Sequence, residues 1–277
     1  MLLDSGAERS DVRPRPAEPA EPPAILYRPL GSSALDGVVG VRSVIRVRTT
    51  DGDLLLDEAA SETLVAAGRS AEVDVETFLD AGRRLGEWGT RHPELMVWAT
   101  VAAQDGVAHL VDAVPAAVGA AAGVRHRLGV RVPLSAVAAD DGAAQGFRRE
   151  GLVVVGRGVD AELLTDLGGL EHLPVDVVEL DPELVRRLPD SDEAVEEVSS
   201  VLGTAARAGV PTLAAGVDTL ETLQIIEGLG VDLVEGALAG LPEQALIIGM
   251  LLGQVGVGPG PAGASSLLDS ASVGPSR

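Results

Sequence analysis

Three acidic residues stand at the ends of strand-like segments, where carboxylates commonly build metal sites and acid–base centres. Asp181 closes the run LPVDVVELD, Asp218 follows the apolar run that starts at Pro211, and Glu235 lies in the next apolar run. Oxygen ligands suit hard divalent cations, so one hypothesis is that these three carboxylates share a cation. In the competing interpretation, each carboxylate accepts hydrogen bonds from backbone N–H groups or faces solvent.

A glycine-containing turn is the second candidate. The run GRGVDAEL, at 156–163, follows a strand-like segment and precedes a helix-like one. Backbone N–H groups at such a turn can bind phosphate. The turn has neither a complete G-x-G-x-x-G pattern nor a Walker pattern, so a purely structural turn is the alternative. No serine has the G-x-S-x-G context of a hydrolase, and the absence of Cys excludes a thiolate nucleophile.

The segments that must position these residues alternate between strand and helix patterns. We predict strands at 25–30, 38–48, 95–103, 129–137, 152–155, 175–180, 211–217 and 232–238. Helix patterns cover 78–88, 162–173, 193–207 and 219–229, and Gly230 suits the position after the last of these. Such alternation favours a parallel sheet, and the length suits a TIM-like (β/α)₈ barrel. Because 25–49 contains two strands and no helix, we expect the barrel to begin with an antiparallel strand.

Composition limits the kinds of partner. The formal net charge is −21, which disfavours binding to nucleic-acid polymers and to anionic membranes. All 21 basic residues are Arg, and neither Lys nor Asn occurs, which indicates a GC-rich genome and, we expect, a bacterial source. The longest apolar run, at 245–257, is too short to span a bilayer, and the N-terminus shows no signal-peptide pattern. We therefore expect a cytoplasmic protein without membrane contact.

The two ends of the chain differ from its middle in composition. Residues 1–23 contain RPRPAEPAEPP, and residues 259–277 are rich in Gly, Pro and Ser. Such stretches lack the apolar residues that a packed element needs. We predict a disordered N-terminal arm at 1–23, one barrel domain at 24–258 and a disordered C-terminal tail at 259–277.

Four stretches together resemble the EAL domain family of cyclic-di-GMP phosphodiesterases. LPVDVVELD, PTLAAGVDT and LGVDLVEGALAGLP follow one another at the spacing of the family's LPVDVLKID, VVAEGVET and LGCDYVQGYLFSRP. Upstream, VVGVRSVIRVRTTDGDLL is similar to the family's VGVEALLRWRHPDGGLL. The resemblance covers residues 25–252 and is weakest at 104–160. It implies a barrel whose reactive end lies at the carboxyl ends of the strands, with two Mg²⁺ or Mn²⁺ ions held there.

Most positions that hold the metals in the family carry other residue types here. The Glu that names the family falls on Arg42, which reverses the charge, and the Asn of the following strand falls near Thr100. The acidic pair of DDFGTG is replaced within 156–161, unless a displaced Asp160 serves instead. The other family residues (two Glu of LEITE, the Lys of KID, two Glu of AEGVE and a Gln) fall on Pro133, Ala136, Glu179, Ala215, Asp218 and Glu235. A fixed guanidinium at Arg42 would repel a divalent cation.

These replacements predict a degenerate EAL domain without catalytic residues and without a bound metal cofactor. The first hypothesis is a regulatory or protein-interaction module with a protein partner. The alternatives are a receptor that binds cyclic-di-GMP or another nucleotide without hydrolysing it, and a phosphodiesterase with displaced ligands. Whether the chain is an enzyme stays open, with inactivity favoured. Arg46 matches the Arg of the family's EALLR stretch and is either a residual phosphate contact or an arginine on the strand face.

The candidate ligand-binding residues are accordingly Arg46, Asp181, Asp218 and Glu235. A homodimer is a further possibility, because the apolar helix pattern in PEQALIIGMLLGQV carries more apolar residues than closing a barrel needs. We expect its residues Leu246, Ile247, Met250 and Leu251 to close the barrel or to pack against a second subunit.

Overall fold

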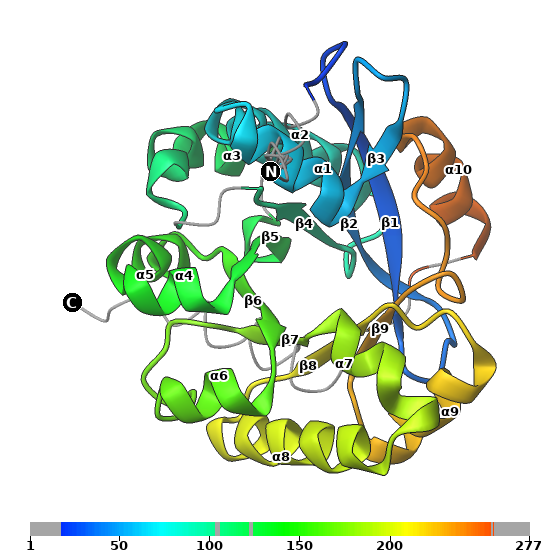
Figure 1. Cartoon of the computed structure of the whole chain (residues 1–277). Helices are drawn as coiled ribbons and strands as arrows, with labels where there is room; N and C mark the ends of the chain where they lie inside the picture. Colours follow the sequence, from blue (N-terminus) through cyan, green and yellow to red (C-terminus); the bar gives the residue numbers. More distant parts are fainter. Residues whose placement is uncertain (1–17, 103–105, 122–123, 256, 258–277) are drawn as a thin grey trace, which may run out of the picture.

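The chain forms a closed barrel of strands surrounded by helices (Figure 1). The computed structural model describes residues 18–102, 106–121, 124–255 and 257. Within them, one sheet has the strand order β1-β9-β8-β7-β6-β5-β4-β2-β3, and an additional β1–β2 pairing closes the ring. Eight strands make the ring and β3 extends beyond it, which confirms the predicted TIM-like barrel.

The strands are β1 (Ala24–Ser32), β2 (Val38–Arg48), β3 (Leu54–Leu56), β4 (Met96–Thr100), β5 (Leu128–Pro133), β6 (Val153–Val159), β7 (Val177–Leu180), β8 (Thr212–Ala215) and β9 (Leu233–Glu235). The α-helices are α1 (Asp57–Ala66), α2 (Ser70–Gly89), α3 (Val114–Ala120), α4 (Leu134–Ala139), α5 (Asp141–Arg149), α6 (Ala161–Asp166), α7 (Pro182–Arg187), α8 (Asp192–Ala208), α9 (Leu220–Leu229) and α10 (Ala245–Val255). Short 3₁₀ helices cover Ala108–Ala113, Arg125–Arg127 and Leu188–Asp190.

The first strand runs against its neighbours, as the sequence predicts. β1 is antiparallel to β2, with Ala24 opposite Arg46, and antiparallel to β9, with Gly31 opposite Val234. The pairs from β2–β4 through β8–β9 are all parallel. β3 pairs with the end of β2 in a hairpin that the sequence analysis did not predict, because three residues are too few to show an alternating pattern.

The helices with the clearest sequence signals have caps at both ends. The hydroxyl of Ser191 accepts a hydrogen bond from the Ala194 N–H at the start of α8, and Thr219 does the same for α9. α8 ends at Gly209 and α9 at Gly230, both in the left-handed conformation that glycine adopts without strain. These caps explain why the predicted helices 193–207 and 219–229 match α8 and α9 closely.

Several predicted boundaries are wrong, and two of them show why. The strand predicted at 129–137 ends at Pro133, and α4 begins at Leu134. A short buried helix and a buried strand both appear as an apolar run, so periodicity does not separate them. The helix predicted at 162–173 stops at Asp166, since Gly168 and Gly169 take positive φ values of 70° and 104° that break the helix.

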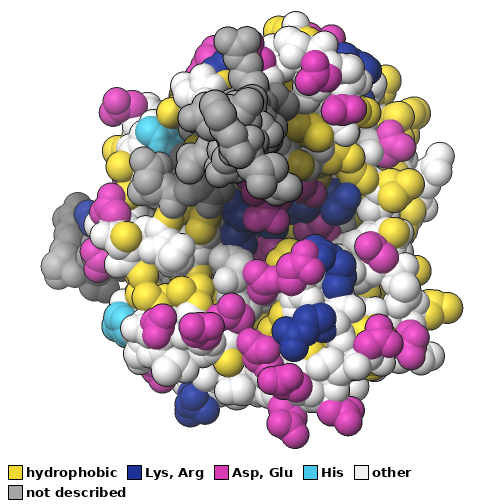
Figure 2. Space-filling view, in the orientation of Figure 1, with side chains coloured by type: hydrophobic (Ala, Val, Ile, Leu, Met, Phe, Trp, Pro, Cys, Tyr) yellow, Lys and Arg dark blue, Asp and Glu magenta, His cyan; other side chains and the backbone are white. Residues whose placement is uncertain are grey.

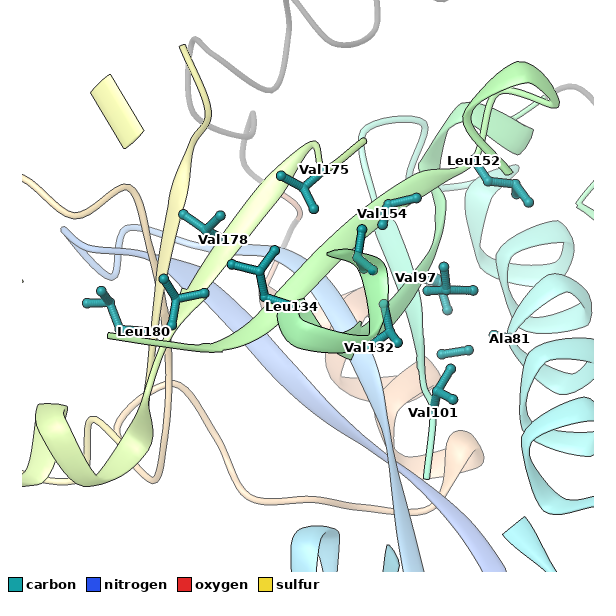
Figure 3. Packing of buried hydrophobic residues seen from close by; sticks show 14 of the residues in the cluster. Ala81, Val97, Val101, Val132, Leu134, Leu152, Val154, Val175, Val178 and Leu180 are labelled. Carbon is teal, nitrogen blue, oxygen red and sulfur yellow. The ribbon is translucent and has the colours of Figure 1, made fainter. Parts of the chain in front are cut away.

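Two apolar layers hold the barrel together. Outside the strands, residues such as Val97, Val154 and Val178 pack toward the helices, with Ala81 of α2 near Val97 (Figure 3). Inside the ring is a second cluster of Leu30, Val39, Met96, Trp98, Val153, Val155, Val177, Leu213 and Leu233. Gly129 makes room for its largest member, because a Cβ at this position would lie 2.6 Å from the Trp98 ring.

The last helix presents some of its apolar residues to the barrel and others to solvent. α10 packs against β1, and Ile248 and Leu252 are its buried residues. Of the four residues expected either to close the barrel or to pack against a second subunit, Leu251 is partly buried against the core, whereas Leu246, Ile247 and Met250 are exposed. An almost uniformly apolar segment has no polar face, so its sequence does not show which residues face the barrel.

At the N-terminal boundary, residues 18–23 lie beside the end of β2: the Ala20 N–H donates to the Arg48 carbonyl at 2.8 Å. The remainder of the predicted arm and the predicted tail at 259–277 lie outside the described residues. Within the described part of the chain, no helix is both long and apolar enough to cross a membrane.

Candidate functional site

A cleft of about 460 Å³ opens at the carboxyl ends of the parallel strands. Figure 2 shows this hollow near the centre of the face, with Arg, Asp and Glu side chains gathered in it. Side chains alternate along a strand, so the inward residues after the interior apolar cluster must line the cleft. They are Arg28, Arg42, Thr100, Arg131, Arg157, Glu179, Ala215 and Glu235, joined by Asp57 from α1. We call the charged members, Arg28, Arg42, Asp57, Arg131, Arg157, Glu179 and Glu235, the charged layer.

Arg42 lies at the centre of the charged layer and is 2% exposed. Its guanidinium donates to both carboxylate oxygens of Asp57, at 2.6 and 2.9 Å, and also to both carboxylate oxygens of Glu235. Arg28 donates to Glu235 at 2.8 Å from the neighbouring strand β1. Planar guanidinium groups match carboxylates through such paired hydrogen bonds, so the network fixes all four side chains.

The two acids of this network are ionised in the folded chain. Burial alone would raise the pKa of Glu235, but Arg42, followed by Arg131 and Arg28, brings that pKa below its ordinary value. The pKa of Asp57 also falls well below its usual range, since the Arg42 ion pair outweighs the effect of burial. Asp57 begins α1 with a positive φ of 52°, an unfavourable conformation that its bond to Arg42 helps to hold.

A second buried pair crosses the barrel between β5 and β7. Arg131 donates to both carboxylate oxygens of Glu179, whose side chain is completely buried. Burial would lower the pKa of Arg131, and the adjacent Glu179 carboxylate outweighs it and raises that pKa. Both charges are therefore fixed as an ion pair.

Arg157 of β6 is held more loosely. Its closest carboxylate is that of Glu58, 3.9 Å away on a side chain that is 68% exposed. Its own side chain is 12% exposed. Within the described part of the chain, its Nε–H is buried and has no hydrogen-bond partner.

The structure places the predicted site residues in different surroundings. Asp181, Asp218 and Glu235 all line the cleft, whereas Arg46 is not among the described residues that line it. Asp181 accepts hydrogen bonds from the N–H groups of Glu183 and Leu184 at the start of α7. Asp218 accepts one from the Ala237 N–H at 2.7 Å. Glu235 instead binds arginines, as described above.

The residues of the cleft do not fit a two-metal centre. Among the residues that the structure describes, no three His, Asp or Glu side chains form a group that could hold a metal ion. Asp181, Asp218 and Glu235 therefore do not converge on one point. Asp160, the possible displaced ligand, caps α6 by accepting from the Leu163 N–H at 2.7 Å.

Comparison with known proteins agrees with the barrel and its cleft. A family profile described as the EAL domain matches residues 24–242. This chain belongs to the EAL domain family. No curated protein matches its sequence.

Several solved structures resemble this chain in fold. The PaMucR phosphodiesterase in complex with c-di-GMP has a TM-score of 0.70 at 19% identity, covering 82% of this chain and 94% of the other. The FimX EAL domain of Xanthomonas citri, also with c-di-GMP, gives 0.65 at 17%, covering 80% and 88%. The EAL domain of Mycobacterium smegmatis DcpA gives 0.67 at 17%, covering 86% and 100%. In each comparison the match includes most of the other protein's chain, so the similarity spans the whole EAL barrel.

Several charged-layer residues were not predicted. Pro133 and Ala136, onto which we placed two family glutamates, are not among the described cleft residues, and the inward residue near the end of β5 is Arg131. Alternation within LGVRVP was the available signal, since Gly129 and Arg131 share a face. No sequence pattern indicates that Asp57 belongs to the cleft, because its approach to Arg42 depends on the β2–β3 hairpin.

Proposed function

We propose that this EAL domain does not hydrolyse cyclic-di-GMP by two-metal chemistry and acts as a non-catalytic regulatory or protein-interaction module. The observation that carries this proposal is Arg42, buried in the cleft and bonded to Asp57 and Glu235. By the family resemblance, its position is that of a metal-ligating glutamate. The same guanidinium also uses the two carboxylates nearest to it, which leaves them poorly suited to bind a cation.

Electrostatics supports the proposal. Two unit charges 4 Å apart interact by roughly 4 kcal/mol at an effective dielectric of about 20, and a divalent ion doubles that repulsion from a guanidinium. Moving Arg42 aside to admit a metal would also leave a buried arginine without its carboxylates, which costs several kcal/mol. The charged layer therefore opposes metal binding both directly and through the stability of the fold.

A second candidate is a receptor that binds cyclic-di-GMP or another nucleotide without hydrolysing it. It is favoured by the four arginines of the charged layer, which line a cleft at the barrel end where EAL domains bind their substrate by the family resemblance. The three carboxylates of the same layer neutralise most of that positive charge. For this reason we place it second.

Other features of the proposal follow from sequence. The protein partner, a homodimer and a cytoplasmic location remain proposals. The exposed apolar residues of α10, Leu246, Ile247 and Met250, are compatible with a partner surface.

One experiment separates these functions. The purified chain is incubated with cyclic-di-GMP and either Mg²⁺ or Mn²⁺, and turnover and binding are measured on the same samples. The proposal predicts neither linear dinucleotide product nor metal-dependent binding, and a pull-down then identifies the protein partner. Tight binding without turnover would favour the receptor, and product at enzyme-like rates would refute the proposal.

A further inference from the structure

A second cavity lies at the opposite end of the barrel from the charged cleft. Its volume is about 350 Å³, and it lies between α8 and α9, where these helices lead into β8 and β9. Because the two strands begin here, the cavity shares no lining residue with the cleft at the carboxyl ends of the strands. A ligand of this cavity would therefore not touch the charged layer.

The walls of this cavity are largely apolar. Leu202 of α8, Leu229 of α9 and Val210 between α8 and β8 line it, and each is only partly buried against the barrel core. The aliphatic stem of a long side chain can pack along such a surface while its polar end reaches a partner. The cavity thus suits a side chain with an apolar stem.

One carboxylate lies among these apolar residues. Asp232 lines the cavity, and its Oδ2 accepts hydrogen bonds from the backbone N–H and the hydroxyl of Thr212, at 2.8 and 3.0 Å. Within the described residues, its Oδ1 accepts no hydrogen bond, and it is not among the buried polar atoms without a partner. This oxygen is therefore open to solvent and can accept a hydrogen bond from a ligand.

Two helix ends add negative potential at the same place. α8 ends at Gly209 and α9 at Gly230, and both glycines line the cavity. The carboxyl end of a helix has a partial negative charge, which favours a cation beside it. The described residues that line the cavity include no Arg or His, because Arg207 in the last turn of α8 donates to Thr204 at 2.9 Å and lines a different cavity. The cavity is thus suited to a positively charged side chain that it does not itself contain.

The hydrogen bonds of Asp232 favour lysine over arginine as that side chain. A guanidinium fork binds a carboxylate best through both oxygens, but Oδ2 already accepts two hydrogen bonds from Thr212. An ammonium group is a compact charge with three donors, so it can use Oδ1 alone. This chain contains no Lys, so the lysine must belong to a different protein. The net charge of −21 attracts a basic partner.

We propose that the cavity between α8 and α9 is a docking site for one lysine side chain of a basic protein partner. Its ammonium group donates to Asp232 Oδ1, and its four-carbon stem lies against Leu202, Val210 and Leu229. This inference rests on the proposed function, because it assigns a surface to the protein partner of a non-catalytic module.

The test titrates the full chain, labelled with ¹⁵N, with the N-acetylated amides of lysine, arginine and norleucine at about 0.15 M salt. Norleucine has the lysine stem without its charge. Amide chemical shifts of Gly209, Gly230 and Asp232 report binding at the cavity. For so small a probe we expect a dissociation constant on the order of 1 mM for the lysine amide, and binding at least about tenfold weaker for the norleucine amide.

Three variants locate the binding. Asp232→Asn removes the charge and keeps an oxygen that Thr212 can bind, and Ala206→Leu narrows the cavity from an exposed position on α8. The control, Glu76→Gln, removes the same charge from an exposed position on α2, on another side of the barrel (Figure 1). We expect Glu76→Gln to bind the lysine amide as the unchanged chain does, and the other two to bind it at least about fivefold more weakly. If Asp232→Asn does not fold, Ala206→Leu still tests the site, because substitutions at exposed positions change stability little.

The absence of shifts at Gly209 and Gly230 would overturn the site, and so would lysine binding that neither Asp232→Asn nor Ala206→Leu weakens. An arginine amide that binds as tightly as the lysine amide would overturn the assignment to lysine. None of these results bears on the proposed function, which fails if the chain hydrolyses cyclic-di-GMP when Mg²⁺ or Mn²⁺ is supplied. The two failures are therefore distinguishable.

Discussion

The interior of this barrel has two levels built by the same strands but stabilised in different ways. On β7, β8 and β9, Val177, Leu213 and Leu233 belong to the apolar interior cluster. Two residues later on β7 and β9, Glu179 and Glu235 belong to the charged layer and pair with arginines. Both β7 and β9 continue through the two levels, so the difference on these strands lies in their side chains.

Apolar and charged layers differ in how they respond to change. Burying apolar surface is favourable for each residue separately, at about 25 cal/mol per Å². A buried ion pair is favourable only as a pair, because each charge alone has lost its hydration. Replacing any one member of the charged layer is therefore expected to destabilise the fold, because its partner would be left as a lone buried charge.

The largest expected effect comes from breaking the charged layer at one partner. Glu235→Ala removes the carboxylate that Arg28 and Arg42 share, and we expect it to lower the free energy of unfolding by about 3–5 kcal/mol. Urea denaturation measures the change. Glu183→Gln, at an exposed ion pair on α7, is the control and should change stability by less than about 0.5 kcal/mol. A Glu235→Ala loss as small as the control's would mean that the layer is not a coupled network.

Breaking the apolar level should cost somewhat less. Leu213→Ala removes a fully buried side chain from the interior cluster, and we expect a loss of about 3 kcal/mol in the same urea assay. Because this loss involves no charge, it should be the same at low and high salt. A strong dependence on salt would contradict the distinction between the two levels.

Replacing both members of a charged pair separates the net contribution of the ion pair from the effect of leaving one charge unpaired. Arg131→Met combined with Glu179→Leu removes the pair without leaving a lone buried charge, so we expect stability within about 1 kcal/mol of the unchanged chain, or above it. Glu179→Leu alone should be strongly destabilised. A double variant as unstable as the single one would show that the pair contributes through its own attraction and not through mutual compensation.

The smallest expected effect is the change with pH in the stability difference between the unchanged chain and Glu235→Gln. The pKa of Glu235 is lowered on folding, so its contribution to stability is complete above its unfolded pKa of about 4 and is lost as the pH falls through the folded value. The stability gap between the unchanged chain and Glu235→Gln should therefore narrow below about pH 4. Urea midpoints measured from neutral to acidic pH test this, and a gap that widens on acidification would reverse the assigned shift.

The two levels also differ in how far the sequence predicts them. The alternation of strand and helix patterns predicted the barrel, and the two strands within 25–49 predicted its antiparallel first strand. The runs LPVDVVELD and GVDLVEG placed Glu179 and Glu235 correctly on strands. The arginine partners of these acids were harder to predict, because the ion pairs join strands that are far apart in the sequence. Arg131 lies 48 residues from Glu179, and Arg42 lies 193 residues from Glu235.

Three further residues of the charged layer were not predicted from the sequence. Arg131 was missed because the end of β5 was placed too late, and Asp57 because its positive φ and its hairpin leave no repeating pattern. Arg157 lies within a run that we interpreted through its glycines, whereas its side chain is what enters the cleft. Side-chain pairing in three dimensions thus carries information that periodicity along one segment does not.

Titration of the chain with Mn²⁺, followed by the electron paramagnetic resonance signal of free Mn²⁺, tests the central claim most directly. If arginines hold the carboxylates of the cleft, Mn²⁺ should bind only weakly to the acidic surface, and salt at about 0.15 M or above should suppress this binding. Tight binding of one or two ions per chain that persists in salt and is lost in Glu235→Gln would contradict the account.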